Sequence, residues 1–147
     1  MRVLASLTVL CLAAAVAAAG EKPVKVRDLP PAVQKAMEQE TKGAVVKGYA
    51  QETEDGKVFY EVETKRDGVA RDVTFDPSGA LVSVEEEVTL ASIPAAARAA
   101  IEKGAAGGKI GMVEKVTELG QVKYEAHVSK GLKKSEIVVK EDGSPAK

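Results

Sequence analysis

An internal repeat constrains this chain more than any other feature of its sequence. A shift of 64 positions places Leu29-Pro30 on Ile93-Pro94, and the register then continues without a gap. In the segments 53–61 and 117–125, six of nine positions are identical. A helix start, a turn glycine and a strand tyrosine keep one spacing in both copies. The chain therefore contains one small folding unit used twice.

Each copy begins with a short predicted helix. Leu29, Val33 and Met37 recur at the spacing of one helix face, and the segment 93–101 repeats the pattern. Prolines at the start of both segments fit a first helical turn, where no internal N–H bond is lost. The residues that we place at or beside the N-caps are Asp28 and Ser92.

After each helix the apolar period changes to two, which is typical of half-buried strands. Val58, Tyr60 and Val62 share one strand face, whereas Phe59 and Glu61 share the other. Glycine-containing turns separate the successive strands. The first copy therefore reads as a helix followed by four antiparallel strands. The second reads as a helix and three strands, because its sequence ends where a fourth would begin.

We therefore predict an α+β fold, in which a short helix followed by an antiparallel meander occurs twice and the helices pack on one sheet face. The predicted organisation is a signal peptide over 1–19, a first unit over 20–91 and a second unit over 92–147. The second unit lacks its last strand. This leaves an open sheet edge near the C-terminus.

The first nineteen residues are typical of an export signal. One positive charge at Arg2 precedes an almost entirely apolar stretch, and Ala17-Ala18-Ala19 offers small residues for cleavage after Ala19. The alternatives are an uncleaved membrane anchor or a lipoprotein modified at Cys11. We predict cleavage, a periplasmic or secreted bacterial protein, and no membrane association afterwards.

Composition excludes several functional classes. The formal net charge is −1, and the chain has five aromatic residues and no Trp, so nucleic-acid binding is not expected. A single His and a single Cys exclude a disulfide framework and a clustered Cys/His zinc site. No strained Gly-x-Ser-x-Gly turn is present either. We therefore predict no enzyme activity, no catalytic residues, no cofactor and no metal.

The titratable candidates have plainer interpretations. His127 has no second His or Cys beside it and is predicted to be a solvated surface residue. The run Glu85-Glu86-Glu87 offers oxygen ligands for calcium, but alternate strand residues point to opposite faces, so it is predicted to be solvated. Glu61 and Glu125 each follow a strand tyrosine in separate copies and are predicted to be exposed rather than an acid/base pair.

Function is expected where the two copies differ. Phe59 faces away from the predicted helix side and corresponds to Lys123, so the fold does not require an aromatic ring there. Leu119 occupies a hairpin turn where the first copy has Asp55. The predicted partner contacts are Phe59, Leu119, Glu61, Glu63, Lys123 and His127.

The motif combination resembles the PepSY-like family, which is also described as similar to the bacterial β-lactamase-inhibitor protein. The residues that carry the resemblance are Leu29-Pro30, Asp55-Gly56, Tyr60-Glu61 and Asp76-Pro77-Ser78-Gly79, repeated as Ile93-Pro94, Gly120, Tyr124-Glu125 and Asp142-Gly143. The resemblance covers nearly all of the chain after the signal segment.

The resemblance implies an exported protein that binds or restrains enzymes such as peptidases, through its hairpin loops or the sheet face that the helices leave free. We therefore expect a non-catalytic protein-binding module, an inhibitor or modulator of an envelope enzyme, whose partner is an unidentified protein of the cell envelope. The alternative is a structural, small-ligand-binding or cation-binding periplasmic protein.

Overall fold

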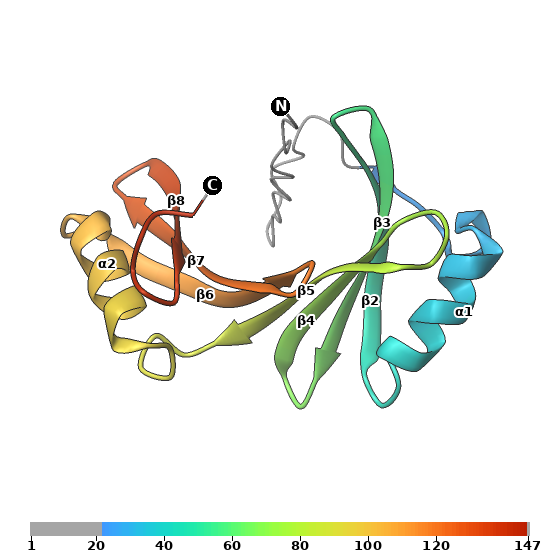
Figure 1. The fold of residues 1–147 in the computed structure, drawn as a ribbon, viewed down its shortest axis with the longest axis horizontal. Helices are drawn as coiled ribbons and strands as arrows, with labels where there is room; N and C mark the ends of the chain where they lie inside the picture. Colours follow the sequence, from blue (N-terminus) through green and yellow to red (C-terminus); the bar gives the residue numbers. More distant parts are fainter. Residues whose placement is uncertain (1–21, 147) are drawn as a thin grey trace, which may run out of the picture. The chain divides into compact units, whose positions relative to one another are not determined.

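The computed structural model describes residues 22–146, so the predicted signal segment lies outside the described residues. The strands follow their sequence order in one eight-stranded antiparallel sheet (Figure 1), which confirms the predicted α+β class. The elements are β1 (Lys22–Pro23), the 3-10 turn η1 (Val26–Asp28), α1 (Pro31–Glu40), β2 (Val45–Glu54), β3 (Lys57–Arg66), β4 (Val69–Phe75), β5 (Leu81–Val88), α2 (Ala95–Ala105), β6 (Lys109–Glu118), β7 (Gln121–Lys130) and β8 (Lys133–Lys140).

The chain divides into two compact units. The first comprises the described residues up to Gly68 together with Asp72–Val82, and the second comprises Val69–Arg71 and the residues from Ser83 onward. The predicted boundaries 20–91 and 92–147 describe the duplication in the sequence rather than these compact units, and they stay a prediction.

The observed N-cap of each helix lies two residues after the residue predicted at or beside the cap, Asp28 or Ser92. The observed N-caps are Pro30 and Pro94, whose side chains donate and accept nothing. Asp28 instead accepts a hydrogen bond from the backbone N–H of Lys25, at 3.1 Å, and Ser92 donates to the carbonyl of Thr89, at 2.8 Å. Both side chains therefore order the turn that precedes the helix rather than the helix itself.

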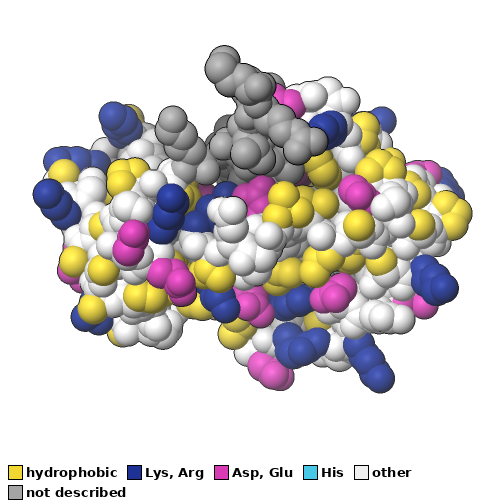
Figure 2. All heavy atoms as spheres, in the orientation of Figure 1, with side chains coloured by type: hydrophobic (Ala, Val, Ile, Leu, Met, Phe, Trp, Pro, Cys, Tyr) yellow, Lys and Arg dark blue, Asp and Glu magenta, His cyan; other side chains and the backbone are white. Residues whose placement is uncertain are grey.

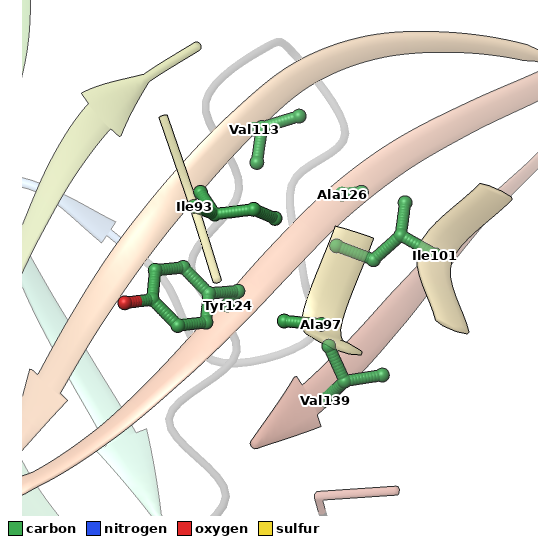
Figure 3. Close-up of a cluster of buried hydrophobic side chains, with 7 residues drawn as sticks. All are labelled: Ile93, Ala97, Ile101, Val113, Tyr124, Ala126 and Val139. Carbon is green, nitrogen blue, oxygen red and sulfur yellow. The ribbon is translucent and has the colours of Figure 1, made fainter. Parts of the chain in front are cut away.

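The core of the second unit lies between α2 and strands β6 to β8. Figure 3 shows side chains of the α2 segment facing those of the strands, with Tyr124 packed beside Ile93. Ala97 and Ile101 are fully buried, and the strand side chains that meet them alternate with residues of the opposite face. The cluster comprises Ile93, Ala97, Ile101, Val113, Tyr124, Ala126 and Val139.

The first unit buries residues at repeat-equivalent positions. Leu29 and Val33 correspond to Ile93 and Ala97, and both are almost completely buried. Its strands contribute Val62, Val73 and Phe75. The predicted core side is therefore confirmed for the second copy, whereas in the first copy Val62 is buried but Val58 and Tyr60 are only half-buried.

The edge of β8 is partly covered. After the turn at Gly143, the backbone N–H of Ala146 donates to the carbonyl of Val138 at 3.0 Å, and Pro145 bridges Val139. The described residues after Gly143 form an isolated bridge rather than a strand. They nevertheless pair with part of the edge that a fourth strand would occupy, so that edge is not fully open.

Candidate functional site

Four titratable side chains converge on the face of the second unit that points away from α2. Tyr124 and Ala126 of β7 face the helix, so the alternating residues Glu125 and His127 project from the opposite face. In the sheet register, Glu125 lies opposite Glu114 of β6, and His127 lies opposite Glu136 of β8. Neighbouring strands thus bring three carboxyl groups around one imidazole. We call Glu114, Glu125, His127 and Glu136 the Glu–His cluster.

Both ring nitrogens of His127 face carboxylates. Its Nε2 lies 3.3 Å from Oε2 of Glu114 and 3.9 Å from Oε1 of Glu125. Its Nδ1 lies 3.7 Å from Oε1 of Glu136. A neutral imidazole carries a proton on only one of its two nitrogens. One carboxylate therefore faces a nitrogen lone pair unless the ring is protonated, the carboxyl group itself carries a proton, or that nitrogen binds a cation.

The two inner carboxyl groups are almost completely buried. The Glu114 and Glu125 side chains are 3% and 4% exposed. Burial, and secondarily the charges of Glu136 and Glu114, raises the pKa of Glu125 to about 7. Burial also raises the pKa of Glu114, although its hydrogen bond to His127 acts in the opposite direction. The cluster therefore holds its negative charge in a poorly solvated place.

Cationic neighbours do not neutralise this charge fully. Lys123, whose charge favours ionised Glu125, has its Nζ 2.8 Å from Oε2 of Glu118. Within residues 22–146, Oε1 of Glu125 is buried and accepts no hydrogen bond. On β5, Glu87 lies opposite Glu114 and adds a further carboxylate to the same row. The arrangement is suited to share a proton between carboxyl groups or to bind a cation.

The raised pKa of Glu125 predicts that stability falls with rising pH. An unfolded glutamate has a pKa near 4.5, so the folded chain binds the proton more tightly between pH 4.5 and about 7. The stabilising contribution of the Glu125 proton is therefore full below pH 4.5 and is lost as the pH rises through 7. Glu125→Gln stays neutral and is expected to be more stable than the unaltered protein at pH 8, by on the order of 2 kcal/mol.

Urea unfolding at pH 4.5 and pH 8, with EDTA present so that no cation compensates the charge, measures this difference. The matched control is Glu61→Gln at the equivalent position of the first unit. A wild-type stability that rises from pH 4.5 to pH 8, with no gain in Glu125→Gln, would contradict the prediction.

The structure corrects several exposure predictions. Phe59 and Glu61 are 6% and 7% exposed, and Glu125 and Glu85 are each 3% exposed, although all four were expected to face solvent. Strand alternation gives the side on which a residue projects, but not how far its neighbours on adjacent strands shield it. His127 is one-quarter exposed and lies among carboxylates, so it is not an isolated surface histidine.

The other predicted partner contacts are scattered. Leu119 is 73% exposed in the β6–β7 turn, as expected for a contact residue. Glu63 is half-buried, and its carboxyl group lies over Gly48 of the neighbouring strand. Lys123 is largely buried in its ion pair with Glu118. Of the predicted contact residues, His127 and Glu125 come together in the Glu–His cluster.

Sequence reasoning missed Glu114 and Glu136. A usable signal was present, because the two-residue turn Leu119-Gly120 pairs Glu118 with Gln121 and so places Glu114 opposite Glu125. The poor alternation of the first strand of each copy obscured it. That irregularity is a register shift between Ile110 and Val113, before the site.

The fold defines an α+β protein with two repeats, each with a helix packed on an antiparallel meander. Its structure is similar to that of a candidate periplasmic protein of Bacteroides eggerthii, with 23% identity, a TM-score of 0.67, and 81% of this chain and 86% of the other covered. A BLIP-like protein of Bacteroides fragilis matches with 21% identity, a TM-score of 0.60, and coverage of 81% and 84%.

A DUF2874 family protein of Bacteroides ovatus matches with 22% identity, a TM-score of 0.63, and coverage of 82% and 86%. No protein-family model matches the sequence, and no curated protein matches it. These similarities show a shared fold. No helix within residues 22–146 combines the length and apolar character that a bilayer crossing requires.

Proposed function

We propose that this protein is an exported, non-catalytic binding module that docks on another envelope protein through the β6–β7 hairpin. The observation that carries the proposal is Leu119, a large apolar side chain that is 73% exposed at a backbone φ of +48°. The left-handed region is unfavourable for any residue with a Cβ, and among these Asn and Asp tolerate it best. The fold gains nothing from this leucine, so a role outside the fold explains it best.

Two other hairpins, both in the first unit, show a turn sequence that suits this fold. The turns Asp55-Gly56 and Asp67-Gly68 also have positive φ at both residues, and both carry the Asp-Gly pair that such turns favour. Leu119-Gly120 departs from this rule at one position only. An exposed leucine on a rigid two-residue turn is suited to enter an apolar pocket of a partner.

Fold and sequence likenesses support the proposed class. The neighbour from Bacteroides fragilis is described as BLIP-like, and the motifs of the chain resemble the PepSY-like family. The amino-terminal signal pattern and the periplasmic descriptions of the neighbours support export. On this basis the bound partner is an envelope enzyme, such as a peptidase, whose activity the module restrains.

The test is Leu119→Asp, which restores the residue of the equivalent turn. We expect the free energy of unfolding of this variant to equal that of the unaltered protein or to exceed it by up to about 1 kcal/mol, because aspartate tolerates positive φ better than leucine does. The same variant should retain at least tenfold less partner when purified protein is immobilised and exposed to envelope extract.

Leu132 supplies the matched control, since it is fully exposed in the β7–β8 turn at the other end of β7. Leu132→Asp should leave capture unchanged. Equal capture by the unaltered protein and by Leu119→Asp would refute the hairpin as the docking element. An assay of the captured enzyme with and without the module then decides whether binding restrains it.

A further inference from the structure

We propose that Glu114, Glu125 and His127 bind a divalent transition-metal cation of the zinc class, with Glu136 as the residue that orients the histidine. This site goes beyond the proposed protein binding and does not depend on it, because cation binding needs no partner protein.

The ligand atoms are spaced for a small cation. In a tetrahedral zinc site with Zn–N and Zn–O bonds of 2.0–2.1 Å, ligand atoms lie about 3.3–3.4 Å apart. Nε2 of His127 is 3.3 Å from Oε2 of Glu114 and 3.9 Å from Oε1 of Glu125. All three ligand atoms lie within 4.8 Å of one another. Small rotations of the two glutamate side chains would complete the geometry and leave a fourth position for water.

An independent observation points to a cation. Oε1 of Glu125 is buried and lacks a hydrogen-bond partner among the described residues, and it lies 3.9 Å from Nε2 of His127. Buried charge without compensation is unfavourable, and a bound cation is an effective source of that compensation. The nearest lysine on the strand, Lys123, already forms an ion pair with Glu118.

The surroundings of His127 resemble the support of a metal ligand. A metal-bound imidazole usually donates its other ring N–H to a carboxylate or carbonyl, which fixes the tautomer and the ring orientation. Oε1 of Glu136 lies 3.7 Å from Nδ1, on the side of the ring opposite Glu114. With a metal bound, a proton on Nδ1 would be directed at Glu136, and the Nε2 lone pair would be free to bind the cation beside the two inner carboxylates.

The donor set selects the class of cation. One imidazole nitrogen with two carboxylate oxygens suits zinc, manganese or ferrous iron. Calcium and magnesium prefer oxygen ligands alone, and copper(I) prefers sulfur. Zinc is therefore the probe of choice.

The first unit lacks the site although it shares the fold. Glu114, His127 and Glu136 correspond to Ala50, Glu63 and Asp72 in the repeat register. Glu125 alone has an identical counterpart, Glu61. The two copies thus differ in chemistry where the cluster lies, and Glu61 offers a buried glutamate in an equivalent strand position without the other ligands.

Calorimetric titration of the purified, chelator-stripped protein with zinc tests the proposal. We expect one zinc ion per chain and an increase in the melting temperature on binding. Glu125→Gln and His127→Gln should each weaken binding at least tenfold, and Glu136→Gln by about tenfold. Glu61→Gln should bind as the unaltered protein does. Cobalt(II) should give the visible absorption of a tetrahedral nitrogen–oxygen site, which His127→Gln loses.

Two results would overturn the site. One is the absence of saturable zinc binding by the folded protein. The other is equal zinc affinity in His127→Gln, Glu61→Gln and the unaltered chain, which would assign binding to dispersed surface carboxylates. Because His127 is partly exposed, His127→Gln should fold, and its melting curve without metal verifies this. None of these measurements requires the partner, so failure of the site leaves the docking proposal untouched.

Discussion

Replacing Gly143 by alanine should destabilise the second unit by about 2–4 kcal/mol. A Cβ at this position would lie 2.6 Å from the carbonyl oxygen of Ala96, a separation that real Cβ atoms do not tolerate. The backbone φ of +79° is itself costly for alanine. Because the contacted atom belongs to the backbone of α2, the clash can be relieved only if the turn after β8 separates from the helix.

The repeat provides a second instance and an internal control. Gly79 has a φ of +82° and would place its Cβ 2.6 Å from the carbonyl oxygen of Ala32, so Gly79→Ala should cost a similar amount in the first unit. Gly56 has a φ of +76° but no atom within 4 Å of its Cβ position. Gly56→Ala should therefore lower the free energy of unfolding only by the cost of placing alanine at a positive φ, about 1–2 kcal/mol.

Urea unfolding followed by circular dichroism separates these values. If all three glycine variants lose the same stability, the turns are constrained by backbone conformation alone and the close approach to the helices carries no energy. If Gly143→Ala is as stable as the unaltered protein, then neither the positive φ nor the close approach to Ala96 is costly for alanine.

The contact of turn and helix explains why the repeat predicted the fold so well. Gly79 and Gly143 are conserved between the copies because each lies against the first turn of its helix. The leucine or isoleucine that precedes each helix is kept because it enters the core. Such residues are determined by packing within one unit, and one unit occurs twice, so their spacing alone indicates the architecture.

Exposure on the second sheet face could not be predicted in the same way. The alternation along the strand places Glu61 and Glu125 on the side away from the helix, but it does not indicate how far side chains of adjacent strands shield them from solvent. Both glutamates proved to be buried. The Glu–His cluster was missed for a related reason, because its members come from three strands and meet only in the paired sheet.

Residues that bear on function are those for which the fold has no explanation. Leu119 is unfavourable in its turn, and the row Glu87, Glu114 and Glu125 sets like charges opposite one another on three neighbouring strands. At the equivalent first-unit positions of Leu119 and Glu114 stand Asp55 and Ala50, which the fold accommodates without cost. Divergence between the copies therefore locates both proposed sites more directly than residue type does.

Truncating Ile101 to alanine should destabilise the second unit by about 2–5 kcal/mol, the range measured for buried isoleucine in well-packed cores. Its side chain is fully buried on α2 and packs against strand residues including Ala126 and Val139 (Figure 3). The small residues Ala97 and Ala126 beside it bring the helix close to the sheet, so neighbouring side chains have little freedom to fill the cavity.

The matched control for this truncation is Leu132→Ala, which removes a fully exposed side chain from a turn of the same unit and should change stability by less than about 0.5 kcal/mol. Charged side chains of both signs are interspersed with hydrophobic side chains on the face that Figure 2 shows. A loss below about 1 kcal/mol in Ile101→Ala would mean that α2 is held to the strands by its ends rather than by its apolar face. The large loss that we expect instead assigns the anchoring of α2 to the same strand faces whose reverse side carries the Glu–His cluster.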